Sequence, residues 1–355
     1  MNSNTDKLVN TLSQLGRIFH QVSLEPAEKT RDYLPEELLL ENAIESAYMN
    51  NPWFIPLFVR FAFNAWAIAL QPEKIRRWSA SYGLPDLHDH ERLTIGIIMA
   101  GNIPMVGLHD LICVLASGHN ALARLSSSDD ILIPAISEII CRIDPDLRER
   151  IRFTREPMKN FDAVIATGSN NSSRYFDYYF GRYPNIIRKN RNGIAVLTGE
   201  ETEEDMIKLA DDIFLYFGLG CRSISKIFVP EGYDFSKIFD SANRYILFSD
   251  HHKYRNDYDY QKSIMLINSV HHEDNGFLLI KQDQSFISPI SVLHAEYYRS
   301  VQELSVQLTE KQDQVQCTVS NSHSMKNTIR PGQSQLPELW DYADGLDTLK
   351  FLMNL

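Results

Sequence analysis

Strand-like and helix-like patterns alternate between residues 93 and 166, and this alternation constrains the fold more than any other feature. Residues 93–99 (LTIGIIM) form a short apolar run rich in β-branched residues, typical of a strand buried on both faces. Helical spacing follows over residues 105–117 and ends at Gly118, a residue type that commonly follows the last helical turn. We expect a second strand at residues 121–125. The alternation predicts a doubly wound parallel sheet.

The pattern continues beyond the second strand. Residues 126–130 (SSSDD) are suited to cap a helix over residues 131–143. Two further strands are expected at residues 151–153 and 161–166. Parallel sheets of this kind bind cofactors at the carboxyl edge of their strands, where the chain leaves the sheet. The side chains directly after each strand are therefore the candidate ligands.

We expect four regions along the chain. They are a helical N-terminal region (1–90), a Rossmann-like dinucleotide-binding domain (91–192), a catalytic α/β domain (193–328) and a C-terminal tail that packs back (329–355). In the second half we expect strands at 193–197, 226–229, 277–280, 290–293 and 315–319, helices at 201–217, 235–245 and 296–308, and a polar stretch at 249–261. The fold class is thus α/β, with two α/β domains and a helical N-terminal region.

Residues 53–70 form the most apolar run of the chain. Pro56, Arg60 and Asn64 interrupt this run, which is also short for a membrane span, so we predict a buried helix there. Its aromatic side chains are interpreted as core or interface. A lining for an acyl chain is the alternative.

Composition narrows the class of function. The formal net charge of −11 argues against nucleic acid as a main ligand, because phosphate binding needs a basic surface. The N-terminus lacks a basic start followed by an apolar core, so we predict no signal peptide and a cytoplasmic location. The four cysteines lie far apart, which indicates neither zinc nor a disulfide framework. The paired histidines at 251–252 and 271–272 lack a matching carboxylate spacing, so no metal is expected.

The segment YFGLGCRSISKIFVP (216–230) carries the candidate nucleophile, Cys221. Gly218 and Gly220 permit a close approach of the backbone to a substrate. Amides at a helix end, or Arg222, can lower the pKa of a cysteine at such a turn and produce a reactive thiolate. A buried cysteine beside a tight turn is the alternative interpretation.

Three groups of polar residues follow predicted strands. Asn102 lies in a strand-to-helix loop, where its amide can donate to an oxyanion, or can instead cap its own turn. Thr167, Gly168 and Ser169 follow the fourth strand, where hydroxyls and helix-start amides bind phosphate. Arg124, Ser126 and Ser127 follow the second strand and suit an adenosine ribose or a 2′-phosphate. A solvated strand end is the alternative for Arg124. The last two groups, Thr167–Ser169 and Arg124 with Ser126 and Ser127, are the candidate cofactor contacts.

Taken in order, the motifs G-N-I-P, T-G-S and G-x-G-C resemble the aldehyde dehydrogenase superfamily. The aromatic N-terminal helices, GLGCRS and the ending RPGQSQLPELWDYADGLDTLKFL are similar to its LuxC-type acyl-CoA reductase branch. This resemblance implies Cys221 as acyl acceptor, Asn102 as oxyanion donor and Thr167, Gly168 and Ser169 as cofactor contacts. It also implies reduction of a fatty acyl thioester to the aldehyde with NADPH, or NADH as the alternative.

Departures from the superfamily pattern refine this expectation. The aldehyde-oxidising enzymes carry a general-base glutamate roughly where residues 185–188 (NIIR) stand, and its absence favours reduction over hydrolysis of the acyl-enzyme. Only the proline of the nicotinamide-ribose segment, E-x-F-G-P, has a counterpart in residues 285–289 (SFISP).

The expected partners are acyl-CoA or an acyl-enzyme donor such as an acyl synthetase, and we expect a homo-oligomer. Two other functions stay open at this point. One is a reductase of the same superfamily acting on an acyl phosphate. The other is a non-catalytic scaffold, which carries an acyl group on Cys221 or binds an acyl synthetase without hydride transfer.

Overall fold

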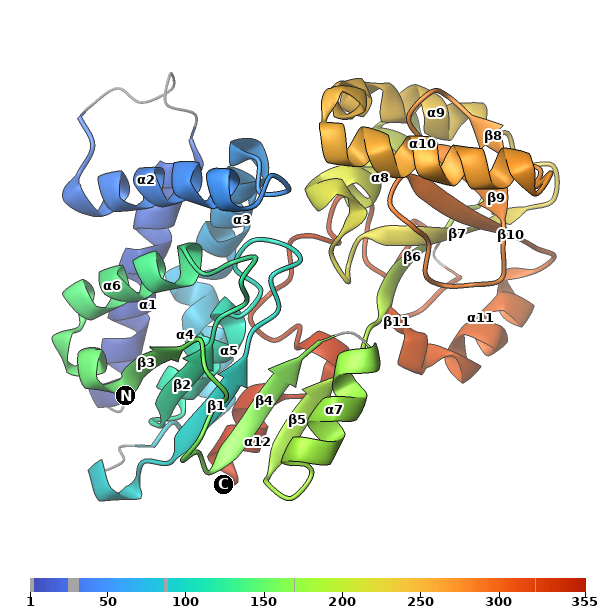
Figure 1. The fold of residues 1–355 in the computed structure, drawn as a ribbon. Coiled ribbons are helices and arrows are strands. Elements are labelled where there is room, and N and C mark those ends of the chain that lie inside the picture. Colours follow the sequence, from blue (N-terminus) through green and yellow to red (C-terminus); the bar gives the residue numbers. More distant parts are fainter. Residues whose placement is uncertain (1–2, 25–31, 86–88, 169, 323) are drawn as a thin grey trace. The chain divides into compact units, whose positions relative to one another are not determined.

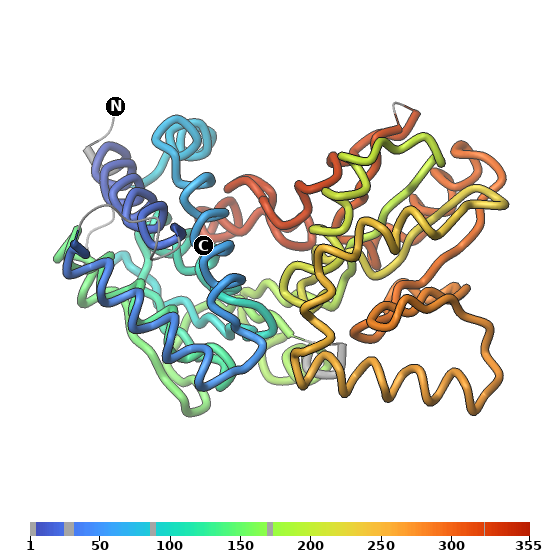
Figure 2. Tube along the Cα trace, turned by 90° about the horizontal axis from the view of Figure 1, so that it is seen from above, coloured from blue at the N-terminus to red at the C-terminus, as the bar shows by residue number. Residues whose placement is uncertain are grey.

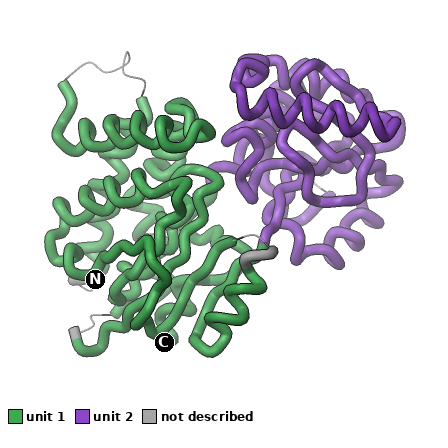
Figure 3. The backbone as a smooth tube through the Cα atoms, viewed as in Figure 1, with its two compact units in different colours: residues 1–189, 337–355 green, residues 190–336 purple. Residues whose placement is uncertain are grey.

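The computed structural model describes residues 3–24, 32–85, 89–168, 170–322 and 324–355. The chain forms two compact units, shown in different colours in Figure 3. The first unit combines residues 1–189 with residues 337–355, and the second comprises residues 190–336. The chain therefore passes from one unit to the other twice.

Four helices open the first unit: α1 (Ser3–Ser23), α2 (Pro35–Asn50), α3 (Pro56–Ala69) and α4 (Pro72–Ala80). The last three each begin with proline, whose missing N–H and fixed φ suit the first helical position. Helix α1 packs against α2 and α3, and Figure 2 shows these blue helices side by side. Leu12, Leu15 and Phe19 of α1 are buried. The most apolar run of the sequence is thus a core helix, α3.

A five-stranded parallel sheet follows, in the order β3-β2-β1-β4-β5 (Figure 1). Its strands are β1 (Thr94–Ile98), β2 (Asn120–Arg124), β3 (Ile151–Thr154), β4 (Ala163–Thr167) and β5 (Asn185–Arg188). The connecting helices are α5 (Leu108–Ala116), α6 (Leu132–Ile143) and α7 (Asn170–Phe180). The chain winds outward from β1 to β3 and then returns to add β4 and β5 on the other side. This reversal confirms the doubly wound sheet.

The centre of this sheet is apolar on both faces. Ile95 and Ile97 of β1 and Val164 and Ile165 of β4 are fully buried. Such strands need no alternation of polar residues, which explains why LTIGIIM reads as a continuous apolar run. Helix α5 is buried along most of its length and packs against β1 and β2.

The second unit holds a six-stranded sheet in the order β11-β6-β7-β10-β9-β8. Its strands are β6 (Asn192–Val196), β7 (Ile224–Pro230), β8 (Glu273–Asp274), β9 (Leu279–Gln282), β10 (Val292–Tyr298) and β11 (Val315–Val319). All neighbours are parallel except β8 and β9. Its main helices are α8 (Glu203–Phe214), α9 (Ser236–Ala242), α10 (His252–Ile267) and α11 (Val301–Glu310).

The structure departs from the local sequence pattern at three places in the second half. The polar stretch 249–261 contains the start of helix α10, which buries Tyr254 and Tyr258 although its other residues are polar. Glu296 lies in strand β10, which continues to Tyr298, and the helix begins only at Val301. Arg188, which opens the basic run RKNR (188–191), is a buried residue of β5. In each case tertiary packing overrides the local pattern.

The C-terminal segment is divided between the two units. Residues 329–336 belong to the second unit, where Ile329 bridges to Val319 of β11. Residues 337–355 belong to the first, where α12 (Thr348–Met353) packs against α5. Among the described residues, no helix combines the length and the apolar character that crossing a membrane requires.

Candidate active site

The carboxyl edge of the first sheet gathers the predicted cofactor residues. Ile98 at the end of β1 pairs with Arg124 on one side and Ala166 on the other. Arg124 ends β2, and Thr167 ends β4. The loop that begins after Ile98 carries Asn102. All three elements therefore meet where the strand order reverses, the position at which doubly wound sheets bind their ligands.

The loop that carries Asn102 lies directly against the turn after β2. A Cβ atom on Gly101 would lie 2.5 Å from Oγ of Ser126 and 2.7 Å from its Cβ, so only glycine fits. Asn102 itself is exposed. The loop then passes through Met105, which has a left-handed backbone (φ 63°). A glycine and one left-handed residue thus allow the loop to follow the surface of the neighbouring turn.

A buried carboxyl, Asp129, holds these two segments together. Its Oδ2 accepts a hydrogen bond from the Met105 N–H at 2.8 Å. Its own backbone N–H donates to the Ser126 carbonyl at 3.1 Å. Asp129 is 4 % exposed, and this burial raises the pKa of its carboxyl to about 7. Nothing in the sequence beyond its place in SSSDD distinguishes this residue.

Thr167 participates in a buried ionic cluster. Arg188 of β5 donates to Oγ1 of Thr167 at 3.2 Å and forms a bidentate pair with Asp110 of α5. The same guanidinium donates to Thr348 of α12 at 2.8 Å. The hydroxyl of Thr167 therefore already accepts one hydrogen bond from the protein.

The other predicted cofactor residues differ in their surroundings. Ser126 Oγ accepts from the Ser128 N–H at 3.2 Å, and the Ser127 carbonyl accepts from Asn50 at 3.3 Å. Arg124 is exposed, and Gly168 is partly buried. Ser169 lies outside the described residues. Their role as cofactor contacts stays a prediction.

Cys221 lies in the second unit, in a turn between α8 and β7. Helix α8 stops at Phe214, and Tyr216, Phe217 and Gly218 then adopt left-handed backbone conformations (φ 56°, 55° and 75°). Two of these residues are buried non-glycines, a costly conformation that persists only where the surroundings enforce it. Cys221 follows this break and is exposed.

The other three cysteines differ from Cys221. Cys113 and Cys141 are buried in α5 and α6, and burial raises the pKa of both thiols. Cys317 is partly buried in β11, and its Sγ lies 3.8 Å from the Arg222 carbonyl. Of the four, Cys221 is the most accessible thiol.

Titratable side chains of β7 and β10 lie near the predicted nicotinamide segment of the second sheet. Lys226 is fully buried; its ammonium donates to the carbonyls of Asp283 and Gln284 and pairs with Glu296. His294, beside it in register, contacts the Ser285 carbonyl at 3.0 Å. Burial lowers the pKa of Lys226 and of His294. These side chains fix the start of the loop at residues 283–289.

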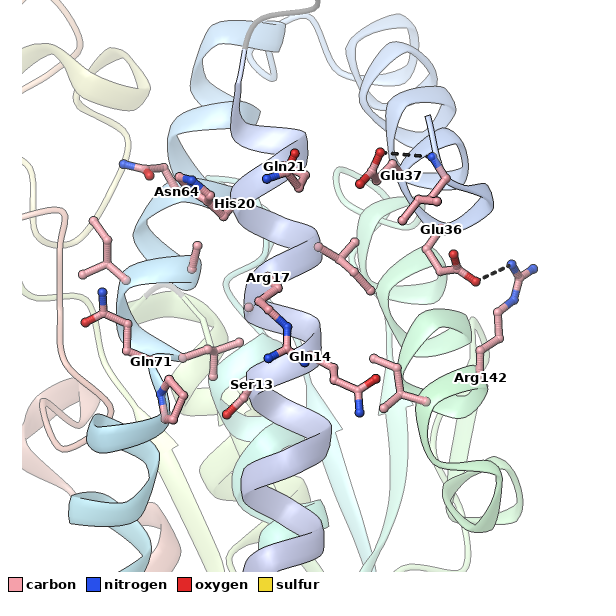
Figure 4. Close-up of a pocket in the computed structure, with 18 residues that line it drawn as sticks. Ser13, Gln14, Arg17, His20, Gln21, Glu36, Glu37, Asn64, Gln71 and Arg142 are labelled. Atoms are coloured by element: carbon pink, nitrogen blue, oxygen red, sulfur yellow. Dashed lines mark hydrogen bonds and ion pairs between the residues drawn. The ribbon is translucent and has the colours of Figure 1, made fainter. Parts of the chain in front are cut away.

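A cavity lies elsewhere in the first unit, beside α1. It has a volume of about 1130 Å³ and is lined by polar and apolar side chains, mainly from α1, α2, α3 and α6 (Figure 4). Its labelled polar residues include Arg17, His20, Asn64 and Arg142. None of the predicted site residues lines it. Among the described residues, no three metal-binding side chains come together.

The solved structures that resemble this chain include aldehyde dehydrogenases. Aldehyde dehydrogenase 21 from Physcomitrella patens, in complex with succinate, matches 99% of this chain over 87% of its own, with 11% identity and a TM-score of 0.62. Indole-3-acetaldehyde dehydrogenase from P. syringae, with NAD⁺ and IAA, matches 91% of this chain over 73% of its own, with 12% identity and a TM-score of 0.61. Aldehyde dehydrogenase C from Pseudomonas syringae, with NAD⁺ and octanal, matches 86% of this chain over 70% of its own, with 12% identity and a TM-score of 0.59. These matches establish an aldehyde-dehydrogenase-like α/β fold.

No curated protein matches the chain significantly. A model of one protein family, described as acyl-CoA reductase (LuxC), matches residues 90–238. This range begins just before β1 and ends within α9, and it contains both Asn102 and Cys221. Residues 90–238 therefore match the acyl-CoA reductase (LuxC) family model, and the chain has a fold of the aldehyde dehydrogenase type.

Proposed function

We propose that this protein reduces an acyl-CoA to the aldehyde with NADPH, through an acyl group carried on Cys221. The observation that carries the proposal is the exposed thiol of Cys221, which follows a strained backbone break inside the range that matches the reductase family. A family match alone would not distinguish a nucleophile from a core cysteine. The exposure and the enforced left-handed residues favour a nucleophile.

Acyl transfer starts at the thiol of Cys221. The thiolate attacks the carbonyl carbon of the thioester, and the coenzyme A thiolate leaves as the acyl–Cys221 bond forms. We assign the stabilisation of the tetrahedral oxyanion to the side-chain amide of Asn102 and the backbone N–H of Cys221. A hydride from a bound nicotinamide cofactor, with a proton, would reduce the enzyme thioester to a thiohemiacetal, and its collapse would release the aldehyde and restore the Cys221 thiol.

The carboxyl edge of the first sheet suits the dinucleotide. The exposed Arg124 offers a cation for a 2′-phosphate, and Ser126 and Ser127 offer hydroxyls for the adenosine ribose. The close approach of Gly101 to Ser126 leaves backbone, without a side chain, beside these groups. NADPH bound there would supply the hydride for reduction. NADH is the alternative donor.

The buried state of Arg188 supports reduction over oxidation. Where the aldehyde-oxidising enzymes roughly have their general base, this chain has a strand whose last residue is paired with Asp110. Hydrolysis of an acyl-enzyme needs a base that activates water. Without a carboxylate there, the acyl group is better suited to hydride transfer than to hydrolysis.

The donor of the acyl group is a thioester in this proposal. It reaches Cys221 either as free acyl-CoA or from an acyl-enzyme such as an acyl synthetase. Acyl phosphate is the competing donor, and a direct comparison of the two substrate classes separates them.

NADPH oxidation with a series of acyl-CoA chain lengths tests the proposal. We expect aldehyde formation by the wild type and by Cys317→Ser, and none by Cys221→Ala. Labelled acyl-CoA without NADPH should leave its acyl group on Cys221. Asn102→Ala should lower the rate of acylation about 100- to 1,000-fold at unchanged NADPH affinity. An adduct on another cysteine, or acyl transfer without any nicotinamide binding, would contradict the proposal.

A further inference from the structure

The two residues after Cys221 are held by a short part of the C-terminal segment, residues 330–335, which we call the C-terminal brace. The guanidinium Nε of Arg222 donates to the Ser334 carbonyl at 2.6 Å. The side-chain amide of Gln335 donates to Oγ of Ser223 at 3.2 Å. Both contacts lie within the second unit. The nucleophile turn is thus attached to a segment more than 100 positions away in the sequence.

Asp212 attaches the same brace to the helix that precedes the turn. Its two carboxylate oxygens accept from the backbone N–H groups of Gly332, at 2.7 Å, and Ser334, at 2.9 Å. Asp212 lies in α8 and is 1 % exposed. Burial raises the pKa of this carboxyl to about 6, so it is mainly ionised at neutral pH. Hydrogen bonds to a buried carboxylate are stronger than those between neutral groups.

The approach to Cys221 from α8 is fixed as well. Phe217, in its left-handed conformation, packs with its ring centroid 4.4 Å from that of Phe248 and 4.5 Å from that of His251. On the far side of the turn, a Cβ atom on Gly193 would lie 2.6 Å from the Arg222 carbonyl. The backbone around Cys221 therefore has little room to shift.

We propose that Asp212 is a positioning residue for Cys221, acting through the C-terminal brace. Asp212 holds the brace, and the brace holds Arg222 and Ser223. Together they fix where the thiolate and the Cys221 N–H stand when an acyl group is transferred. The nature of that transfer rests on the function proposed above. The contacts themselves do not depend on it.

Positioning has a kinetic signature that differs from loss of folding. Acyl transfer requires the thiolate and its oxyanion donors in one geometry, and a shift of about 1 Å can cost about 100-fold in rate. Alkylation by a small reagent such as iodoacetamide requires only an accessible thiolate. A positioning defect should therefore slow acylation far more than alkylation.

Asp212→Asn is the test variant, because its amide oxygen still accepts one N–H while its NH₂ group opposes the other. The matched control is Asp211→Asn, the adjacent residue of α8, whose carboxylate binds Tyr245 and Arg244 instead. Gln335→Ala is a milder second variant, which removes only the contact to Ser223. All variants are made in a Cys317→Ser background, so that alkylation reports on Cys221.

Three measurements are compared: acylation by acyl-CoA in a single turnover, alkylation by iodoacetamide, and hydrogen exchange of the amides of residues 219–224. For Asp212→Asn we expect acylation to fall about 10- to 100-fold, with alkylation and NADPH affinity little changed and with faster exchange in this segment. Gln335→Ala should show a smaller loss in the same direction. Asp211→Asn should match the background.

Equal acylation rates in Asp212→Asn and Asp211→Asn would overturn the inference. If Asp212→Asn loses its cooperative unfolding transition, Gln335→Ala decides by the same comparison. If acyl-CoA does not acylate the wild type, the proposed function fails, and hydrogen exchange still decides the inference. Faster exchange in Asp212→Asn than in Asp211→Asn supports the brace, and equal exchange refutes it.

Discussion

Arg188 and Asp110 form a buried bidentate ion pair, with nitrogen–oxygen distances of 2.6 and 2.7 Å, below the carboxyl end of β4. Both side chains are at most 6 % exposed. The same guanidinium contacts Thr167 at the predicted cofactor edge and Thr348 in the C-terminal helix. One cation thus connects three elements that are distant in the sequence. Breaking this ion pair should therefore lower the stability of the first unit.

Asp110→Asn should destabilise the protein by about 3–5 kcal/mol, because it leaves the charge of Arg188 buried without a carboxylate. Urea unfolding measures the loss. The control is Arg155→Ala, which removes an ion pair to Asp130 whose arginine is 80% exposed. An exposed pair of this kind contributes at most about 1 kcal/mol. Equal effects of the two variants would contradict the buried cluster.

Gly101→Ala should destabilise the loop that carries Asn102 by about 1–3 kcal/mol, because its new methyl group would overlap Ser126. Gly83→Ala is the matched control, since a Cβ there meets nothing within 4 Å. In the double variant Gly101→Ala/Ser126→Gly, the clash is largely removed. A double-mutant cycle on urea unfolding should therefore show a favourable coupling. Additive losses would mean that the loop and the turn do not touch.

The free energy of unfolding should depend on pH through Asp129. Its folded pKa of about 7 lies above its ordinary value of 3.8, so the folded state holds its proton more tightly than the unfolded state. Stability from this group is complete below about pH 4 and is lost as the pH rises to about 7, by at most about 1.4 kcal/mol per pH unit.

Asp129→Asn removes this dependence and keeps an acceptor for the Met105 N–H. The variant should match the wild type near pH 4 and exceed it in stability at pH 8. Denaturant unfolding across this range gives the comparison. The control is Asp130→Asn, whose carboxylate lies in the same turn but pairs with Arg155. A wild-type curve parallel to that of Asp129→Asn would show that Asp129 titrates normally.

The direction of the reaction is a further prediction. Aldehyde with NADP⁺ and coenzyme A should run back to acyl-CoA, because the thiol is itself a good nucleophile. Without coenzyme A, little free acid should form, because water lacks a positioned base. Glu201 is a carboxylate that could be considered, but its oxygens accept from the N–H groups of Thr198 and Gly199.

Glu201→Gln should therefore leave slow acid formation unchanged. Acid and acyl-CoA are quantified separately after a fixed number of NADP⁺ turnovers. Rapid acid formation that disappears in Glu201→Gln would identify this residue as a base. It would also move the protein from the reductases to the aldehyde oxidisers.

Four of the five strands of the first sheet were predictable because their signals are local, whereas β5 was not expected. A strand buried on both faces needs a short apolar run, and residues 93–99 supply one directly before a glycine loop. Cys221 was predictable as a candidate for a similar reason, since its glycines and the following strand lie beside it in the sequence. Its exposure and the strained residues before it required the structure.

The structure supplies what depends on distant partners. Helix α10 escapes a local prediction because its buried side chains include tyrosines, whose rings pack inside while their hydroxyls satisfy partners such as the Phe277 carbonyl. Arg188 suggests a surface position until Asp110, 78 positions away, is placed beside it. Asp212 looks like any acid of an amphipathic helix. Its partners, Gly332 and Ser334, lie 120 and 122 positions later in the sequence.

The position of the C-terminal brace in the sequence has a consequence for biosynthesis. Ribosomes complete residues 330–335 after every residue that we assign to catalysis or cofactor binding. The turn around Cys221 can receive its hydrogen bonds from Ser334 and Gln335 only after 112 further residues have been made. Until then, the nascent chain carries this cysteine in a turn that lacks the brace.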